Sequence, residues 1–138
     1  MSFLLDTNVV SELRRREPNQ EVTSWISSVR ATDLYLSALV VGEIRNGIER
    51  LARRDRVQAT AYDKWLADLL DLYGDRIVPV TAEVAEMWGR LNVPDPLPII
   101  DGLLAATALV HDWTLVTRNT ADVLRTGVRL LDPFESRG

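Results

Sequence analysis

The sequence predicts an α/β fold in which a short parallel sheet of about four to five strands is flanked by helices on both faces. Short apolar runs, of the kind that form strands buried on both sides, alternate with longer segments whose apolar residues recur at helical spacing. The chain has 138 residues, 46% of them hydrophobic and 26% charged, and shows no repeat, low-complexity tract or linker. These values are typical of a soluble domain with a real core, so we expect a single domain over 1–138.

The strand candidates are short and mostly apolar. The first, Phe3 to Leu5, ends in Asp6, which suits a buried parallel strand with a polar residue at its carboxyl end. The remaining candidates are 34–36, 76–80, 114–117 and 129–131. Ligands of open parallel sheets bind beyond the carboxyl ends of the strands. Asp6 and the residues after Thr117 therefore lie where a site is expected.

The helical segments are marked by capping residues and by apolar stripes. Ser37 and Thr81 are good N-caps, Gly74 ends a long helix, and Pro98 suits the first turn of another. The predicted helices cover 7–13, 20–29, 38–51, 57–73, 82–91 and 98–110, with a loop over 94–98.

The composition excludes several classes of protein. Without cysteine the chain has neither disulfides nor thiolate metal sites. His111 is the only histidine, which makes a zinc site or a serine–histidine–aspartate triad unfavoured. No stretch approaches the roughly 20 apolar residues that span a bilayer, and the first residues lack the basic segment of a signal peptide. We therefore expect a cytoplasmic protein without membrane contact.

The charge pattern leaves two explanations open. The net charge of −4 argues against a surface coated with phosphate-binding groups, yet only Lys64 among the 16 basic residues is a lysine. Arginine binds phosphate in a bidentate manner and stacks on bases, so the bias suits nucleic-acid binding. Genomic codon bias is the simpler explanation.

Two acids lie early in the chain at positions that suit a site. Asp6 is either the N-cap of the helix that follows or a ligand, because a carboxylate at the end of an apolar strand is costly unless it is capped, paired or bound to metal. Glu43 is either solvent-facing or part of a site. The nearby Gly42 and Gly47, each costing up to about 1 kcal/mol in a helix, favour a close approach of some group to this helix.

Two further acids lie in the second half of the chain. Asp101 stands in the first turn of an otherwise apolar helix, where it either interacts with the helix dipole or faces a site, and we expect Gly102 to leave room beside it. Asn119 or Thr120 either caps a short helix, with Asp122 reciprocating, or belongs to a strand-end loop that supplies another metal ligand.

Together these acids favour a metal site made of oxygen ligands. Oxygen ligands suit hard cations such as Mg²⁺ or Mn²⁺, which activate water and neutralise charge on a phosphodiester. Thr7 and Thr117 could orient the carboxylates or ordered waters.

The order and spacing of these residues resemble the PIN-domain ribonucleases, in particular the VapC and FitB type toxins of bacterial toxin–antitoxin operons. The resemblance runs from about Phe3 to Phe134. The matching pieces are Leu5–Val9 with Ser11–Glu12, Ser37–Ile44 with Gly47, Ile100–Asp101, and Thr117–Asn119 with Asp122.

The resemblance implies a set of site residues. It implies that Asp6, Glu43 and Asp101 bind Mg²⁺, for which Mn²⁺ could substitute. Many relatives have an aspartate where this chain has Asn119, which could still bind metal through its carbonyl, while Asp122 could support the site or take over. Many relatives also have a phenylalanine where Val123 stands, so a second metal is less expected than the first.

The resemblance also implies an activity and partners. The family cleaves RNA by metal-activated water without a covalent enzyme intermediate. Its members usually form homodimers and are blocked by an antitoxin that typically carries the DNA-binding domain and covers the active site. On this hypothesis Glu43 or Asp122 is the base. The candidates for phosphate contact are Arg14, Arg15, Arg45 and Arg118.

Three other functions compete with this interpretation. A phosphoacceptor receiver domain would need an acidic pair near the first strand and a lysine after a later strand, whereas Lys64 lies within a helix. A haloacid-dehalogenase-like phosphatase would need a second aspartate where Asn8 stands. The more serious alternative is a catalytically weak regulatory binding module of the same fold, which the amide at Asn119 makes worth testing.

Overall fold

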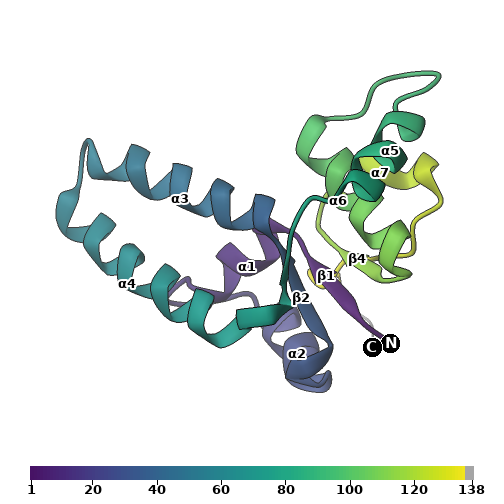
Figure 1. Ribbon diagram of the computed structural model, residues 1–138. Helices are drawn as coiled ribbons and strands as arrows, with labels where there is room; N and C mark the ends of the chain where they lie inside the picture. Colours follow the sequence, from purple (N-terminus) through teal and green to yellow (C-terminus); the bar gives the residue numbers. More distant parts are fainter. Residues whose placement is uncertain (136–138) are drawn as a thin grey trace.

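A computed structural model, which describes residues 1–135, contains a five-stranded parallel sheet in the order β3-β2-β1-β4-β5 (Figure 1). The strands are β1 (Phe3–Leu5), β2 (Leu34–Ser37), β3 (Ile77–Val78), β4 (Thr114–Val116) and β5 (Leu130–Leu131). Every neighbouring pair runs parallel. The predicted fold class is thereby confirmed, and β1 with its terminal Asp6 occupies the centre of the sheet.

Seven α-helices flank this sheet in the described part of the chain. They are α1 (Thr7–Leu13), α2 (Gln20–Ser28), α3 (Ala38–Ala52), α4 (Arg56–Tyr73), α5 (Ala82–Leu91), α6 (Ile99–His111) and α7 (Thr120–Val123). As predicted, Ser37 and Thr81 cap their helices: their hydroxyls accept hydrogen bonds from the backbone N–H groups of Leu39 and Val84.

Several boundaries differ from the sequence prediction, most of them by a single residue. The third strand was expected over 76–80 but covers only Ile77–Val78. Arg76 ends a 3₁₀ turn, where its guanidinium donates to backbone carbonyls, and Pro79 lacks the N–H that a longer strand would need. Pro98 is the N-cap of α6 rather than its first residue, and α2 ends one residue earlier than 20–29.

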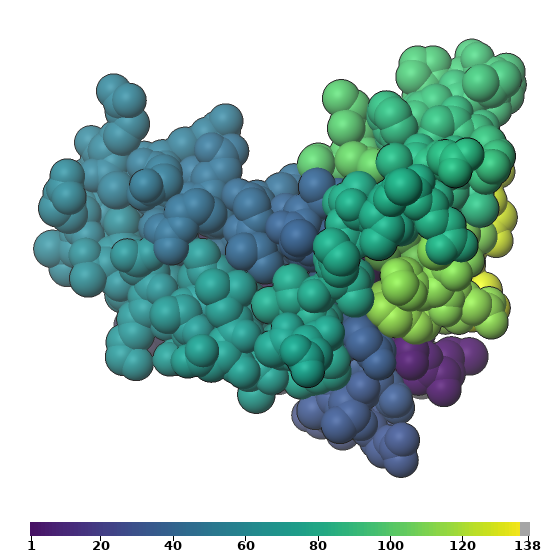
Figure 2. Space-filling view, in the orientation of Figure 1, coloured from purple at the N-terminus to yellow at the C-terminus, as the bar shows by residue number. Residues whose placement is uncertain are grey.

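Helices α3 to α7 form two groups beside the sheet. In Figure 1, α3 and α4 make a long antiparallel arm on one side, while α5, α6 and α7 gather on the other. α3 packs mainly on α4, and α5 on α6. Figure 2 shows a notch between the arm and the lobe of α5 and α6.

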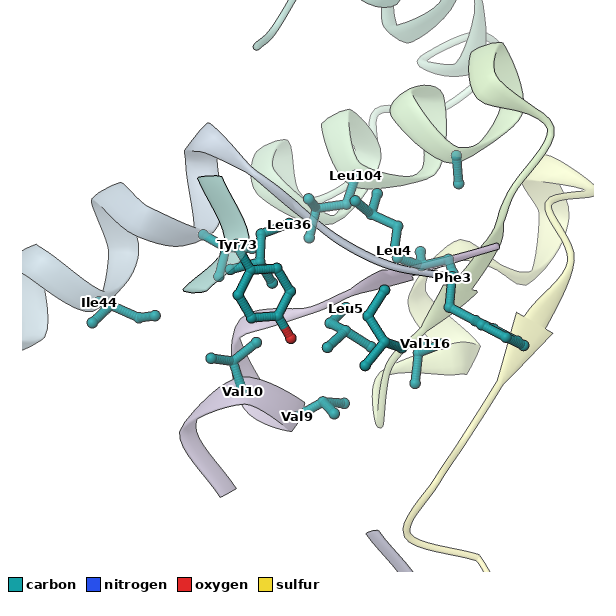
Figure 3. Close-up of a cluster of buried hydrophobic side chains, with 14 of the residues drawn as sticks. Phe3, Leu4, Leu5, Val9, Val10, Leu36, Ile44, Tyr73, Leu104 and Val116 are labelled. Carbon is teal, nitrogen blue, oxygen red and sulfur yellow. The ribbon is translucent and has the colours of Figure 1, made fainter. Parts of the chain in front are cut away.

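Buried apolar side chains hold β1 rigidly between these groups. Leu4 and Leu5 are fully buried, and Leu36, Val116 and Leu104 approach them from β2, β4 and α6 (Figure 3). A fully buried leucine contributes roughly 1.5–3 kcal/mol to stability. The core therefore fixes the end of β1, and with it the position of Asp6.

Gly102 has a packing role that differs from the one predicted. A Cβ added at Gly102 would lie 3.2 Å from Leu97 Cβ and 3.3 Å from two atoms of the Trp88 ring. The glycine therefore lets α6 approach α5 closely, and the expectation that it leaves room beside Asp101 is wrong. Over residues 1–135 no helix combines the length and apolar character needed to cross a membrane.

Candidate active site

Asp6 lies at the carboxyl end of β1 with only 5% of its surface exposed. One carboxylate oxygen accepts a hydrogen bond from the backbone N–H of Thr7 at 2.6 Å, which makes Asp6 the N-cap of α1. The other oxygen accepts from the Thr117 hydroxyl at 2.6 Å and from the Asn8 amide at 3.2 Å. These three donors hold a buried carboxylate in one orientation. Asp6 therefore both caps α1 and presents its carboxylate at the edge of the sheet, so the two roles do not exclude each other.

Glu43 is carried to the same edge by the Ser37 cap, which starts α3 directly after β2. Glu43 Oε1 accepts a hydrogen bond from the Thr7 hydroxyl at 2.5 Å. Thr7 thus links α1 to α3 and directs an exposed carboxylate toward the end of β1. A Cβ added at Gly42 or at Gly47 would meet nothing within 4 Å, so the surface beside Glu43 is open, and the close approach of another group to this helix stays a prediction.

The pKa of Asp101, in the first turn of α6, indicates that the acids lie near one another. Its pKa is raised from 3.8 to about 6, first by burial and then by the negative charges of Asp6, Asp122 and Glu43. A hydrogen bond with Asp122 raises the pKa further. Because like charges raise a carboxyl pKa only at short range, four acids from four separate elements share one site.

Asp122 and Asn119 lie on the loop and short helix that follow β4. Both are exposed. Asn119 occupies the N-cap position of α7 without a side-chain capping bond, and its backbone N–H donates to the Thr117 hydroxyl at 3.0 Å. The reciprocal cap between Asn119 and Asp122 is therefore absent from this segment of the described chain. A role for Asn119 as a metal ligand stays a prediction.

Asn8 joins the two strand ends that form the site. Its amide donates to Asp6, and its carbonyl oxygen accepts from the backbone N–H of Arg118 at 3.3 Å. The sequence pattern included Asn8 without assigning it a role. Its position two residues after Asp6 was the available signal, because Asx side chains bond to nearby groups at strand ends.

The four arginines proposed for phosphate contact have different surroundings. The Arg14 guanidinium lies 3.9 Å from the centre of the Tyr62 ring. The other three have partners of their own: Arg15 pairs with Glu12 at 3.4 Å, Arg45 with Asp63 at 2.6 Å, and Arg118 stacks over Phe134 at 4.3 Å. Exposed ion pairs contribute little to stability, but they direct these side chains.

A groove of about 350 Å³ leads away from the acids between α1 and the α3–α4 arm. Its lining is mixed in charge and polarity. The residues include Thr7, Ser11, Arg14, Glu43, Gly47, Arg54, Gln58 and Tyr62. Arg54, Gln58 and Tyr62 were not predicted to line a site, because their place in the groove depends on how α4 folds back on α3.

The donors at the site fit a hard divalent cation in their chemistry. All are oxygens, and the charge repulsion that raises the Asp101 pKa is what a cation would relieve. Within residues 1–135 no group of three or more acidic, histidine or cysteine side chains is drawn together tightly enough to hold an ion as it stands. The acids influence the pKa of Asp101, but the described residues do not form a closed metal cluster.

Comparisons with known proteins identify the family of the chain. The PIN domain family matches residues 3–126. Toxin FitB of Neisseria gonorrhoeae is 32% identical over 96% of this chain and 98% of its own length. VapC ribonuclease Y4jK of Sinorhizobium fredii is 29% identical over 96% of this chain and 98% of its own.

A solved structure shares the complete fold. FitAB bound to the IR36 DNA fragment superposes with a TM-score of 0.89 at 31% identity and covers 99% of this chain and 98% of that one. The resemblance inferred from the sequence motifs is confirmed. The chain belongs to the PIN-domain family.

Proposed function

We propose that this protein is a magnesium-dependent endoribonuclease that acts as the toxin of a toxin–antitoxin pair. The observation that carries the proposal is the gathering of Asp6, Glu43, Asp101 and Asp122 at one edge of the parallel sheet, where burial and then the charges of the other three acids raise the pKa of Asp101 to about 6. The printed names of the two relatives, a toxin and a VapC ribonuclease, support the same activity.

Each site residue has a separate task in this proposal. Asp6, Glu43 and Asp101 would hold Mg²⁺, or Mn²⁺ in its place, with Asn119 as a further oxygen donor. When bound, such an ion would supply a water of lowered pKa and neutralise charge on a phosphodiester. Thr7 orients Glu43 through its hydroxyl, and Thr117 and Asn8 orient Asp6.

Proton transfer falls to an acid at the rim of the site. Glu43 and Asp122 are both exposed, so either carboxylate can take a proton from an attacking water and release it to solvent. Asp6 is poorly suited to that task because its oxygens already accept three hydrogen bonds. The products are two RNA fragments, and no covalent bond to the protein forms.

The partners follow from the same relatives. FitAB was solved bound to DNA. We propose that this chain pairs with a cognate antitoxin that blocks the acidic site and carries the DNA-binding domain, and that it forms a homodimer. The net charge of this chain is −4, which disfavours contact with the DNA phosphates, so we assign DNA binding to the antitoxin.

The proposal is tested with Asp6→Asn and Asp101→Asn variants assayed on single-stranded RNA in Mg²⁺ or in EDTA. We expect cleavage by the unmodified protein in Mg²⁺, none in EDTA, and a loss of at least about a hundredfold in either variant, because each substitution removes a charged ligand. Asp71→Asn is the matched control, since this exposed aspartate lies on α4 outside the site. Undiminished cleavage by both site variants would contradict the proposal.

A second function is favoured by one observation, the amide at Asn119 where many relatives have an acid. In that case the chain would be a catalytically weak binding module that acts through its partner complex. Expression of the free protein in bacteria separates the two functions. Growth arrest with RNA cleavage supports the toxin, whereas partner binding without either supports the module.

A further inference from the structure

The groove that leaves the acidic site has a positively charged end. Thr7 and Glu43 line it near the acids, while Arg14 and Arg54 line it further along. Neither guanidinium forms an ion pair or hydrogen bond within residues 1–135, although the chain as a whole is acidic. Two unpaired guanidinium groups facing one cavity favour an anionic ligand.

Arg14 is held in place by aromatic rings. Its guanidinium lies 3.9 Å from the centre of the Tyr62 ring and 5.7 Å from that of Trp65. Cation–π contacts of this kind restrict a long side chain without neutralising its charge. The groove therefore presents a pre-positioned cation beside an aromatic side chain, which is the combination that binds phosphate and a nearby base.

Gln58 adds a hydrogen-bonding group to the same end of the groove. Its side-chain nitrogen donates to the Tyr62 hydroxyl at 3.1 Å, which directs the carboxamide along the aromatic side chain. Carboxamides pair with the edges of bases. Gln58 thus lies where it could distinguish one base from another.

Gly47 keeps the groove continuous between the acids and the arginines. It lines the groove from the middle of α3, and a Cβ added there would meet nothing within 4 Å. A glycine in a helix interior costs up to about 1 kcal/mol against alanine. The packing of α3 does not require a glycine at this position. Its effect is to leave the groove open between the acids and the arginines.

We propose that this groove is a nucleotide-binding subsite for the RNA chain next to the scissile phosphate. Arg14 and Arg54 bind a phosphate of that nucleotide, and Tyr62 and Gln58 contact its base. The inference rests on the proposed ribonuclease function and deepens it: the enzyme takes single-stranded RNA, because only an unstacked base can enter the groove, and it prefers certain bases at this one position.

The first test measures RNA binding apart from cleavage. A fluorescent single-stranded RNA is titrated in Mg²⁺ against the Asp101→Asn protein and against the same protein carrying Arg54→Ala or Arg53→Ala. Arg53 is the matched control, because it is an exposed neighbour that does not line the groove. We expect Arg54→Ala to weaken binding about tenfold and Arg53→Ala to change it less than about twofold.

The salt dependence of binding identifies the phosphate contact. Loss of one contact to single-stranded RNA should reduce the slope of log affinity against log salt by about 0.7 in the Arg54→Ala protein. Gln58→Ala should instead leave the slope unchanged and reduce the difference in cleavage rate among RNAs that vary at one nucleotide beside the cut.

These outcomes separate the subsite from the function on which it rests. Arg54-dependent RNA binding without cleavage by the unmodified protein would contradict the ribonuclease and leave the subsite intact. Normal cleavage together with equal binding by the Arg54→Ala and Arg53→Ala proteins would overturn the subsite. So would a loss of antitoxin binding in Arg54→Ala with RNA binding unchanged, since the groove would then belong to a protein partner.

Discussion

Asp101 should destabilise the metal-free protein at neutral pH, so Asp101→Asn should stabilise it while abolishing cleavage. In the unfolded chain the side chain loses its proton near its ordinary pKa of 3.8, but in the folded protein burial and the nearby acids raise the pKa to about 6. The folded state therefore holds this proton more tightly. Its contribution to stability is lost as the pH rises from about 4 to about 6, and it stays lost above that range.

The magnitude follows from the pKa and the exposure of the site. A rise from 3.8 to about 6 corresponds to about 3 kcal/mol at full effect. Solvent screening at a partly exposed group reduces this to about half, and the α6 dipole, which favours an acid in the first turn, offsets another 0.3–1 kcal/mol, roughly. The expected gain from Asp101→Asn is about 1 kcal/mol, or about 3–4 °C in Tm for a chain of this size.

The assay is thermal unfolding in EDTA at about pH 7.5 and again at about pH 4. The variant should melt above the unmodified protein at the higher pH and close to it at the lower pH, where folded Asp101 is protonated and most of its unfavourable effect on stability is gone. Added Mg²⁺ should stabilise the unmodified protein and have little effect on the variant. A variant that is less stable at both pH values would show that the carboxylate is not repelled by its neighbours, and would refute this account of the site.

Substitutions at three further positions probe how the fold positions the acids. Gly102→Ala should destabilise the protein by about 1–2 kcal/mol, because the crowding of the new methyl group against α5 outweighs the better helix propensity of alanine. Gly42→Ala, whose methyl group meets open space, should instead stabilise the protein by about 0.5–1 kcal/mol. Denaturant unfolding measures both changes, and equal effects would contradict the packing role of Gly102. Thr117→Val should cost about 1–3 kcal/mol and lower cleavage, since it removes a donor from the buried Asp6 carboxylate, and Thr117→Ser should restore both in unfolding and cleavage assays.

Much of the fold could be predicted because its signals are local. The apolar run of Phe3–Leu5, the caps at Ser37 and Thr81 and the alternation of strands with helices are each visible within a few residues. The gathering of the acids also followed from a general rule, since carboxyl ends of parallel strands meet at one edge. Asp6 could be placed at that edge without knowing any long-range contact, whereas the place of Asp101 depends on how α6 packs against β1 and β4.

The remaining features depend on long-range packing that no local pattern encodes. Arg45 pairs with Asp63 only because α4 folds back on α3 in one register, and the same register brings Arg54 and Tyr62 into the groove. Gly102 was interpreted from its neighbour in sequence, whereas its role comes from the Trp88 ring on α5. A single sequence gives the period of a helix but not which residue of another helix it meets.

The fold treats two acids of the same site in opposite ways, and this difference bears on how the site works. Asp6 is buried and receives three hydrogen bonds, so its charge is stabilised and its position is fixed. The charge of Asp101 is opposed first by burial and then by the nearby acids, which together raise its pKa to about 6. A fold that used these residues only at helix N-termini would have no reason to bring them together, because Asp6 caps α1 within its own turn and Asp101 is not the cap of α6. The unfavourable placement of Asp101 is explained if a cation completes the site. Asp6 would then be the ligand whose position is fixed, whereas at Asp101 a proton and the metal ion would compete for the carboxylate.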